Sequence, residues 1–478
     1  MSLFCLAVVT AAPADEKLMV GEPGLGDAIH PGLGNGGYDV EHYWLDMRFS
    51  SDLKGYSATS TLHLRAKRAL SRFDLDLEGN EVETVSIGGA PATWAREGDE
   101  LEITPNSPLK RGENFSVSVR IKGEVPDNRE LERDRIFPPG LARDGEWIQS
   151  LCQPSVAHRM AALADHPSQK APATITISAP SRLNSIANGE LTGTWPDTQN
   201  PDMTVRRFET PFKLAPELLQ IGVGPFTIVR QLGPHGIALR YALPSEQAKA
   251  IAPHLAVVPE AISFLEQRLG PFPLRTYGIY ATPTGGGLET QSLTILDAAS
   301  LGPEGARANG VDATILHEAS HEYFGNSVSP RRWSDLWLNE GHATYYERLW
   351  AQYHGSGLTL EDGMRTIYRR ENLRLRRYGP VAMPRPSAFS NKPLAPYGPV
   401  AYEGGALALY ALNQEVGQAT FERIESAWVT TYRDGCAGTA DYIALASHVA
   451  GRDLTPFLRS WLYSDHVPPM PHHPDWTA

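Results

Sequence analysis

The first half of the chain places hydrophobic residues at alternate positions, which is the pattern of β-strands that bury one face. In residues 43–49, 73–77 and 115–122, apolar side chains alternate with polar or charged ones. Turn-forming residues such as Gly79-Asn80 separate these segments. From about residue 35 to about residue 230 the sequence therefore predicts antiparallel β-sheet.

After about residue 232 the hydrophobic residues recur with helical spacing instead. The expected fold class is α+β with two domains, an antiparallel β-sheet N-terminal domain at residues 21–231 and a mostly helical domain at residues 232–466. Residues 1–20 are expected to be a signal remnant or a flexible N-terminus, and residues 467–478 a disordered tail. The helical segments are expected at residues 245–269, 312–325, 338–351, 360–377, 404–416, 440–449 and 455–463.

The charge balance narrows the classes of partner. Lys and Arg number 43 and Asp and Glu 55, which gives a net charge of −12. An acidic chain argues against nucleic acid or an anionic membrane as the main partner. The three cysteines include no C-x-x-C pair, so no disulfide framework is expected.

The longest apolar run, Leu3–Ala12, lies at the N-terminus and is too short to span a bilayer, so no transmembrane segment is expected. Because Ala12-Pro13-Ala14 and then charged residues follow it, the run resembles the end of a secretory signal and predicts export to the periplasm or the medium. Met1–Ala14 contains no Lys or Arg, however, and a cytoplasmic location is the alternative.

The helical half contains a pattern that points to metal chemistry, His317-Glu318-Ala319-Ser320-His321. On a helix, positions i and i+4 share a face, so both imidazoles can bind one ion, while Glu318 can reach a metal-bound water. Glu340 follows with 18 residues between it and His321 and is the candidate third ligand. Two imidazoles and one carboxylate leave a fourth tetrahedral position for water, which predicts one catalytic Zn²⁺ per chain.

Residues 317–347 resemble the zinc signature of the gluzincin aminopeptidases, the family of aminopeptidase N and leukotriene hydrolase. Residues 286–290 are similar to its G-x-M-E-N exopeptidase loop, residues 400–405 to its Y-x-K-G segment, and residues 152–170 to its Gln-containing substrate segment. The opening residues 34–40 resemble short bacterial members that lack the C-terminal helical domain. The resemblance implies that the helical domain is thermolysin-like.

The family's site residues are implied here only at the matching positions. Through them the resemblance implies a zinc-dependent aminopeptidase that acts on peptides or aminoacyl amides with a free N-terminal amine. The implied roles are zinc ligands for His317, His321 and Glu340, general base for Glu318, and oxyanion stabilisation for Tyr402. Substrate binding is implied for Glu289 and Gln153 at the amine, and for the backbone amides of Gly286 and Gly287 along the peptide.

Some positions depart from the family pattern and leave the preferred side chain open. Thr290 and Gly404 stand where the family has Asn and Lys. His342 and Glu322 are hypothesised to modify the surroundings of the metal. Because longer relatives continue past the catalytic domain, a more open cleft that admits larger substrates is expected.

Two alternatives to the main reading stay open, a dedicated zinc amidase or peptidase for one specialised metabolite or pro-peptide, and an inactive peptide-binding module. The basic segment at residues 365–377 also has two interpretations. It is either a solvated helix face paired with carboxylates, or a site for a substrate carboxylate.

Overall fold

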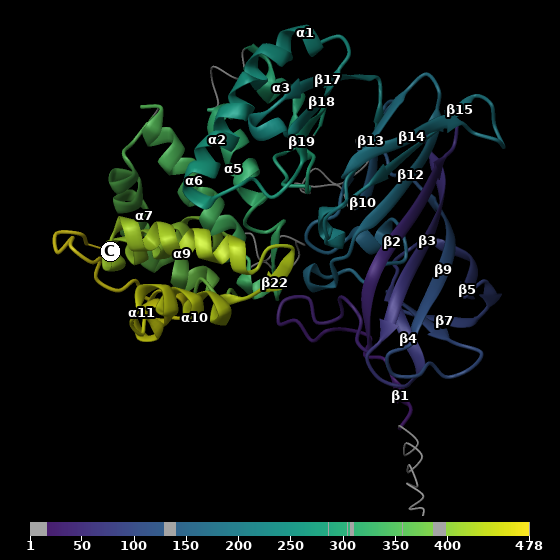
Figure 1. Cartoon of the computed structure of the whole chain (residues 1–478), viewed down its shortest axis with the longest axis horizontal. Helices are drawn as coiled ribbons and strands as arrows, with labels where there is room; N and C mark the ends of the chain where they lie inside the picture. The colour runs from purple at the N-terminus through teal and green to yellow at the C-terminus, as the bar shows by residue number, and fades with distance from the viewer. Residues whose placement is uncertain are drawn as a thin grey trace, which may run out of the picture.

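The computed structural model describes residues 17–128, 140–284, 286–303, 305, 310–355, 357–385 and 398–477. A β-rich half, purple to blue, lies beside a helical half, green to yellow (Figure 1). The α+β fold with two domains is therefore confirmed. Of the predicted signal remnant, residues 1–16 lie outside the described part of the chain.

The β-rich half is built on one eight-stranded sheet. Neighbouring strands pair antiparallel, as predicted, except β2 and β12, which run parallel. In spatial order the strands are β14 (Glu190–Pro196), β15 (Met203–Glu209), β12 (Ala173–Pro180), β2 (Tyr38–Phe49), β3 (Gly55–Ala66), β9 (Asn114–Glu124), β5 (Glu81–Ile87) and β6 (Ala90–Pro91).

Two smaller sheets complete this half. One contains β1 (Met19–Val20), β4 (Leu70–Asp76), β8 (Glu100–Thr104) and β7 (Thr93–Glu97). The other contains β10 (Gly140–Asp144), β11 (Trp147–Leu151), β16 (Ile221–Gly224) and β13 (Asn184–Ala187).

The alternating pattern has different outcomes in two of the predicted strands. In β2 the apolar residues from Tyr43 to Phe49 are buried and those between them are not, as expected for one buried face. In β4 the prediction of one buried face is wrong, because Asp74 and Asp76 are buried as well. Asp76 accepts backbone hydrogen bonds from Gly34 (3.1 Å) and Asp165 (2.6 Å), so a loop and a distant segment cover the second face.

The helical half begins with a mixed sheet of β17 (Phe226–Leu232), β18 (Ala238–Pro244), β19 (Thr276–Thr282) and β20 (Thr294–Asp297). β17 pairs antiparallel with β18, and the other two pairs are parallel. The proposed boundary between residues 231 and 232 falls at the end of β17 and stays a prediction.

Helices pack beside this sheet, and each predicted helical segment corresponds to at least one of them. Short elements join them, including η6 (Trp333–Asp335) and the parallel pair β21 (Val328–Pro330) and β22 (Gly435–Ala437). The helices are α1 (Ala248–Ile251), α2 (Val257–Leu269), α3 (Ala298–Leu301), α5 (Val311–His321), α6 (Trp337–Tyr353), α7 (Leu360–Tyr378), α8 (Gly405–Val416), α9 (Gln418–Thr431), α10 (Thr439–Ala450) and α11 (Thr455–Leu462), with a π-helical turn, η8 (Val400–Gly404), before α8.

One helical stretch among the described residues, Ala248–Leu269, is long and apolar enough to cross a membrane by length and composition. Its α2 part packs against α5 and α9, and side chains such as Ile262 and Leu265 are fully buried there. These contacts account for its apolar residues as parts of the protein core.

The expectation that residues 467–478 form a disordered tail is wrong for the described residues up to 477. Trp476 is buried and stacks flat on Tyr410 of α8, with ring centroids 5.9 Å apart. Asp475 accepts a hydrogen bond from Arg365 of α7 at 2.7 Å. An aromatic contact and an ion pair therefore hold the C-terminal residues against the helical half.

Candidate metal centre

Two packed helices bring the three predicted metal ligands together. α5 begins after Gly310, whose φ of 59° is a left-handed conformation, and carries His317 and His321 on one face. α6 packs against α5 and carries Glu340 in its first turn. The sequence could specify the i, i+4 pair, but only the packing of α5 on α6 brings the carboxylate to it.

The ligand atoms have the spacing of a tetrahedral metal site. Glu340 Oε2 lies 3.4 Å from His317 Nε2 and 3.3 Å from His321 Nε2. Ligand atoms about 2.0–2.1 Å from a tetrahedral Zn²⁺ are about 3.3–3.4 Å from one another. Glu340 Oε2 is also buried and receives no hydrogen bond from the described residues. The residues present therefore fit a zinc ion.

The other ring nitrogens orient both imidazoles. His317 Nδ1 lies 3.0 Å from Glu347 Oε2, and His321 Nδ1 lies 3.1 Å from the Phe324 carbonyl oxygen. Both partners only accept, so Nδ1 carries the hydrogen in each ring and the Nε2 lone pair faces the metal position. Glu347 was not identified from the sequence, although its place seven residues after Glu340 on the same helix was a usable signal.

The acidic surroundings attract a cation. Burial lowers the pKa of His317, but the nearby Glu340 and Glu347 carboxylates outweigh it and raise this pKa well above 6.5. For His321, burial again opposes the shift, and Glu289 and Glu340 raise the pKa to about 9. A metal ion competes with protons for these nitrogens, so metal affinity depends on pH.

Glu318 lies beside the metal ligands in a tight, mostly dry position. Its side chain is buried, and its Oε2 has no hydrogen-bond partner among the residues that the structure describes. A Cβ atom at Gly287 would collide with Glu318 Oε1, so the glycine lets the loop backbone approach the carboxylate. Burial raises the pKa of Glu318 to about 8. The carboxyl is thus placed to take up a proton at neutral pH.

Tyr402 approaches the metal position from the π-helical turn η8. Its ring stacks on that of His317, with centroids 6.2 Å apart and an angle of 11° between the planes. Burial and then the Glu340 carboxylate raise the pKa of its phenol well above 10, so the hydroxyl keeps its proton and can donate it in a hydrogen bond.

Glu289 lies on the loop between β19 and β20, next to the α5 residues. Its carboxylate, that of Glu318 and a His321 ring nitrogen lie within 4.8 Å of one another. Gln153 of the β-rich half donates to Glu289 Oε1 at 2.7 Å. Gly286 and Gly287 of the same loop are partly or fully exposed, with Gly287 at the edge of the cavity. The structure thus brings the predicted substrate residues to the metal ligands.

A buried lysine connects the two halves behind Glu289. Lys170 donates from Nζ to the carbonyl oxygens of Asn326 (2.8 Å) and Ser327 (3.0 Å) and to Ser329 Oγ (3.0 Å). Asn326 in turn donates from its side chain to the Glu289 carbonyl oxygen at 2.7 Å. The sequence contained Lys170 in a recognised motif, but its acceptors lie more than 150 positions away and have no local signal.

A cavity of about 710 Å³ is lined by every predicted site residue except Gly286. Besides the predicted residues it is lined by α6 side chains beyond Glu340, by Arg374 of α7 and by Glu403 of η8. Glu403 accepts a hydrogen bond from Arg348 at 3.2 Å and forms an ion pair with Arg374. Arg348 was not identified from the sequence, whereas Arg374 belongs to the basic segment for which a site for a substrate carboxylate was one of two interpretations.

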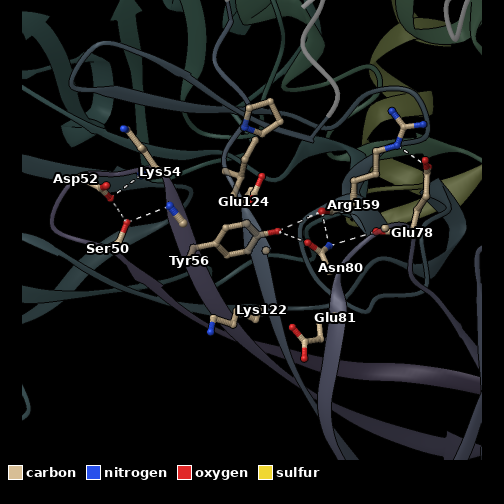
Figure 2. A pocket seen from close by; sticks show the side chains of 15 residues that line it. Ser50, Asp52, Lys54, Tyr56, Glu78, Asn80, Glu81, Lys122, Glu124 and Arg159 are labelled. Carbon is tan, nitrogen blue, oxygen red and sulfur yellow. Dashed lines mark hydrogen bonds and ion pairs between the residues drawn. The ribbon is translucent and has the colours of Figure 1, made fainter. Parts of the chain in front are cut away.

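A larger cavity, about 870 Å³, lies in the β-rich half (Figure 2). Several of its side chains are hydrogen-bonded to their neighbours: the Tyr56 hydroxyl donates to Asn80 (3.2 Å), Asn80 to the Arg159 carbonyl (2.7 Å), and Arg159 to Glu78 (2.5 Å). Glu78 also belongs to a candidate cluster with Asp99 and His158, but Arg159 already supplies the cation there. The chemistry therefore points to the smaller cavity.

The positions that depart from the family pattern lie around the cavity rather than in it. His342 donates to the Leu338 carbonyl (2.7 Å), faces Glu425 (3.1 Å) and stacks on Phe324, whose carbonyl oxygen contacts His321 Nδ1. Glu322 accepts a hydrogen bond from the Ser292 backbone at 2.7 Å. Thr290 is fully buried and donates to the Leu293 carbonyl. The hypothesis that His342 and Glu322 modify the surroundings of the metal stays a prediction.

Comparison with known proteins gives a family match within the helical half of the chain. Residues 254–461 match the family described as Peptidase family M1 domain. Aminopeptidase N of Canis lupus familiaris is 26% identical over 339 residues, which cover 66% of this chain and 35% of that protein. Leukotriene A-4 hydrolase of Xenopus laevis is 24% identical over 327 residues, 65% of this chain and 51% of that protein. The chain thus spans about a third to a half of these relatives.

Solved structures resemble the chain over nearly its full length. An M1 zinc metallopeptidase from Deinococcus radiodurans has a TM-score of 0.80 and 27% identity, covering 94% of this chain and 99% of that one. A mutant of an M1 zinc metallopeptidase from that organism, bound to a Tyr-Ser-Ala substrate, has a TM-score of 0.79 with 27% identity over 94% of this chain and 100% of that one.

Proposed function

This chain belongs to the M1 family of metallopeptidases, and on that premise we propose that it is a zinc-dependent aminopeptidase hydrolysing the peptide or aminoacyl amide bond next to a free N-terminal amine. The observation that carries the proposal is the closeness of the expected amine-binding carboxylate to the groups expected to perform hydrolysis. The Glu289 carboxylate lies within 4.8 Å of the Glu318 carboxylate and the His321 ring nitrogen. An amine bound at Glu289 is therefore one residue or less from the hydrolytic groups.

His317, His321 and Glu340 would hold the Zn²⁺. When bound, the ion lowers the pKa of a coordinated water to about 7 and polarises the substrate carbonyl. Glu318 accepts the proton of the attacking water at its carboxylate and returns it to the leaving amine. Tyr402 donates its phenolic hydrogen to the carbonyl oxygen as negative charge develops there.

Glu289 and Gln153 supply the selectivity for the end of a chain. An α-ammonium replaces water at the Glu289 carboxylate with a charge-assisted hydrogen bond, and the Gln153 contact keeps Glu289 Oε1 in place. An acylated N-terminus offers no positive charge and leaves this buried carboxylate unpaired, which costs binding energy. A free amine is therefore expected to be required.

The test is a panel of aminoacyl fluorogenic amides, each paired with its N-acetylated form. We expect release from the free-amine members only, loss of activity with a chelator, and recovery with added Zn²⁺. Glu289→Ala should reduce the preference for the free amine. Equal hydrolysis of acetylated substrates would overturn the aminopeptidase assignment, and turnover of one specialised amide alone would favour the dedicated amidase instead. No chelator-sensitive release from any substrate would favour the binding module.

A further inference from the structure

We propose that Arg348 and Arg374 form a binding site for the C-terminal carboxylate of a short peptide substrate. This inference rests on the proposed aminopeptidase function and names the class of substrate that the site favours. It concerns the part of the cavity that Arg348, Arg374 and Glu403 line.

One face of α6 leads from the metal position to Arg348. Glu340, Thr344, Glu347 and Arg348 follow the helical repeat, and all four line the cavity. Eight residues of helix separate the Cα atoms of Glu340 and Arg348 by about 12 Å. Long side chains on a helix point back toward its N-terminus, and the Arg348 guanidinium lies 3.2 Å from Glu403, the neighbour of Tyr402 in η8.

Arg374 reaches the same place from α7. The basic segment contains six arginines, all within the described part of the chain, and Arg374 is the member that lines the cavity. Four of the others are exposed and Arg365 pairs with Asp475. Most of the segment is thus a solvated helix face, while one residue of it belongs to the site.

The two guanidinium groups are incompletely neutralised. Both contact one carboxylate, Glu403, so two positive charges share one negative charge. Glu371 lies 3.5 Å from Arg374, but it is buried, and burial raises its pKa to about 7. Gly404 adds no side chain beside these groups, and a Cβ atom there would lie only 2.6 Å from Glu371 Oε1. Arg348 and Arg374 remain 33% and 20% exposed and can accept another anion.

The arginine pair and Glu289 are associated with different metal ligands. His321 clusters with Glu289 and Glu318, whereas His317 bonds to Glu347, the neighbour of Arg348. A peptide bound by its amine at Glu289 therefore extends past the metal position toward the arginines. Extended chain advances about 3.3 Å per residue, so about two or three residues beyond the cleaved bond bring the terminal carboxylate there. Two guanidinium groups converging on one point favour a carboxylate over a neutral end.

The test compares a tripeptide acid, Leu-Gly-Gly, with its C-terminal amide. We expect the wild-type enzyme to hydrolyse the acid with a kcat/KM about 10- to 100-fold higher than that of the amide. In Arg374→Gln and in Arg348→Gln the ratio of acid to amide should fall toward one. Arg369→Gln, at an exposed arginine on another face of the same helix, should retain the wild-type ratio. Because each ratio is taken within one protein, a general loss of folding or turnover cannot produce the result.

A third substrate, Leu-Asp-Gly amide, distinguishes a side-chain carboxylate from the terminal carboxylate of a peptide. The proposal expects this side chain to be a poor substitute for the terminal carboxylate. It is overturned if the acid and the amide of Leu-Gly-Gly react equally in the wild type, if the Gln variants keep the wild-type ratio, or if only the aspartyl peptide is favoured. Failure of the proposed function looks different, because then neither the acid nor the amide is hydrolysed.

Discussion

His317 donates its Nδ1 hydrogen to the Glu347 carboxylate at 3.0 Å, and its Nε2 faces Glu340 at 3.4 Å. Both carboxylates come from α6, so this single helix holds the histidine by both ring nitrogens. A hydrogen bond of this kind selects the tautomer and raises the basicity of the ligating nitrogen.

Glu347→Ala should weaken zinc binding by about 10- to 100-fold, because His317 loses the acceptor that orients its ring. Competition with a chromophoric chelator measures the affinity. The matched control is Glu246→Ala, which removes an exposed carboxylate of the helical half. Equal affinities for the two variants would show that Glu347 does not orient the ligand.

Glu318→Gln should lower kcat/KM on a free-amine amide by about 10² to 10⁴, because the amide cannot accept the proton of water. The substitution leaves the three zinc ligands intact, so the zinc content should remain one per chain. Both quantities are measured on the same preparation. A variant that keeps its zinc and retains wild-type turnover would remove Glu318 from the mechanism.

Lys170→Met should raise KM for free-amine substrates more than it lowers kcat, because Asn326 then holds the Glu289 backbone less firmly. The unfolding free energy should also fall by about 2–4 kcal/mol, since two buried carbonyls lose their donor. Lys170→Arg keeps the charge and the donors and should recover part of both losses. If the Met variant is destabilised but its KM is unchanged, Lys170 is a structural residue only.

Glu217→Gln should make stability less sensitive to pH. Burial raises the pKa of Glu217 from 4.5 to about 8, so between these values the folded chain keeps a proton that the unfolded chain releases. The wild type therefore loses stability as pH rises from about 4.5 to about 8, and the glutamine variant lacks this loss. The urea midpoints of the two proteins should differ more at pH 9 than at pH 5. Glu190→Gln, at an exposed carboxylate, is the control. A difference that does not change with pH would contradict the assignment.

Several features were predictable because they depend on neighbours along the chain. The alternating residues of β2 and the helical repeat around His317 and His321 are local patterns that hydrophobic burial reproduces directly. Where burial depends on another segment, the same reasoning failed. Asp74 and Asp76 read as the solvent face of a strand, but distant segments cover them.

By itself, the sequence determined the α+β class, the helix that presents two imidazoles to one ion, and the carboxylate that follows them. These are consequences of helical and strand periodicity, which acts over a few residues. Only the tertiary structure decided which distant groups complete the site: Glu347 behind His317, Lys170 behind Glu289, and Arg374 beside Arg348 at Glu403. The physical reason is that a side chain's charge partners and burial are set by the packing of whole helices and domains, and no local pattern records that packing.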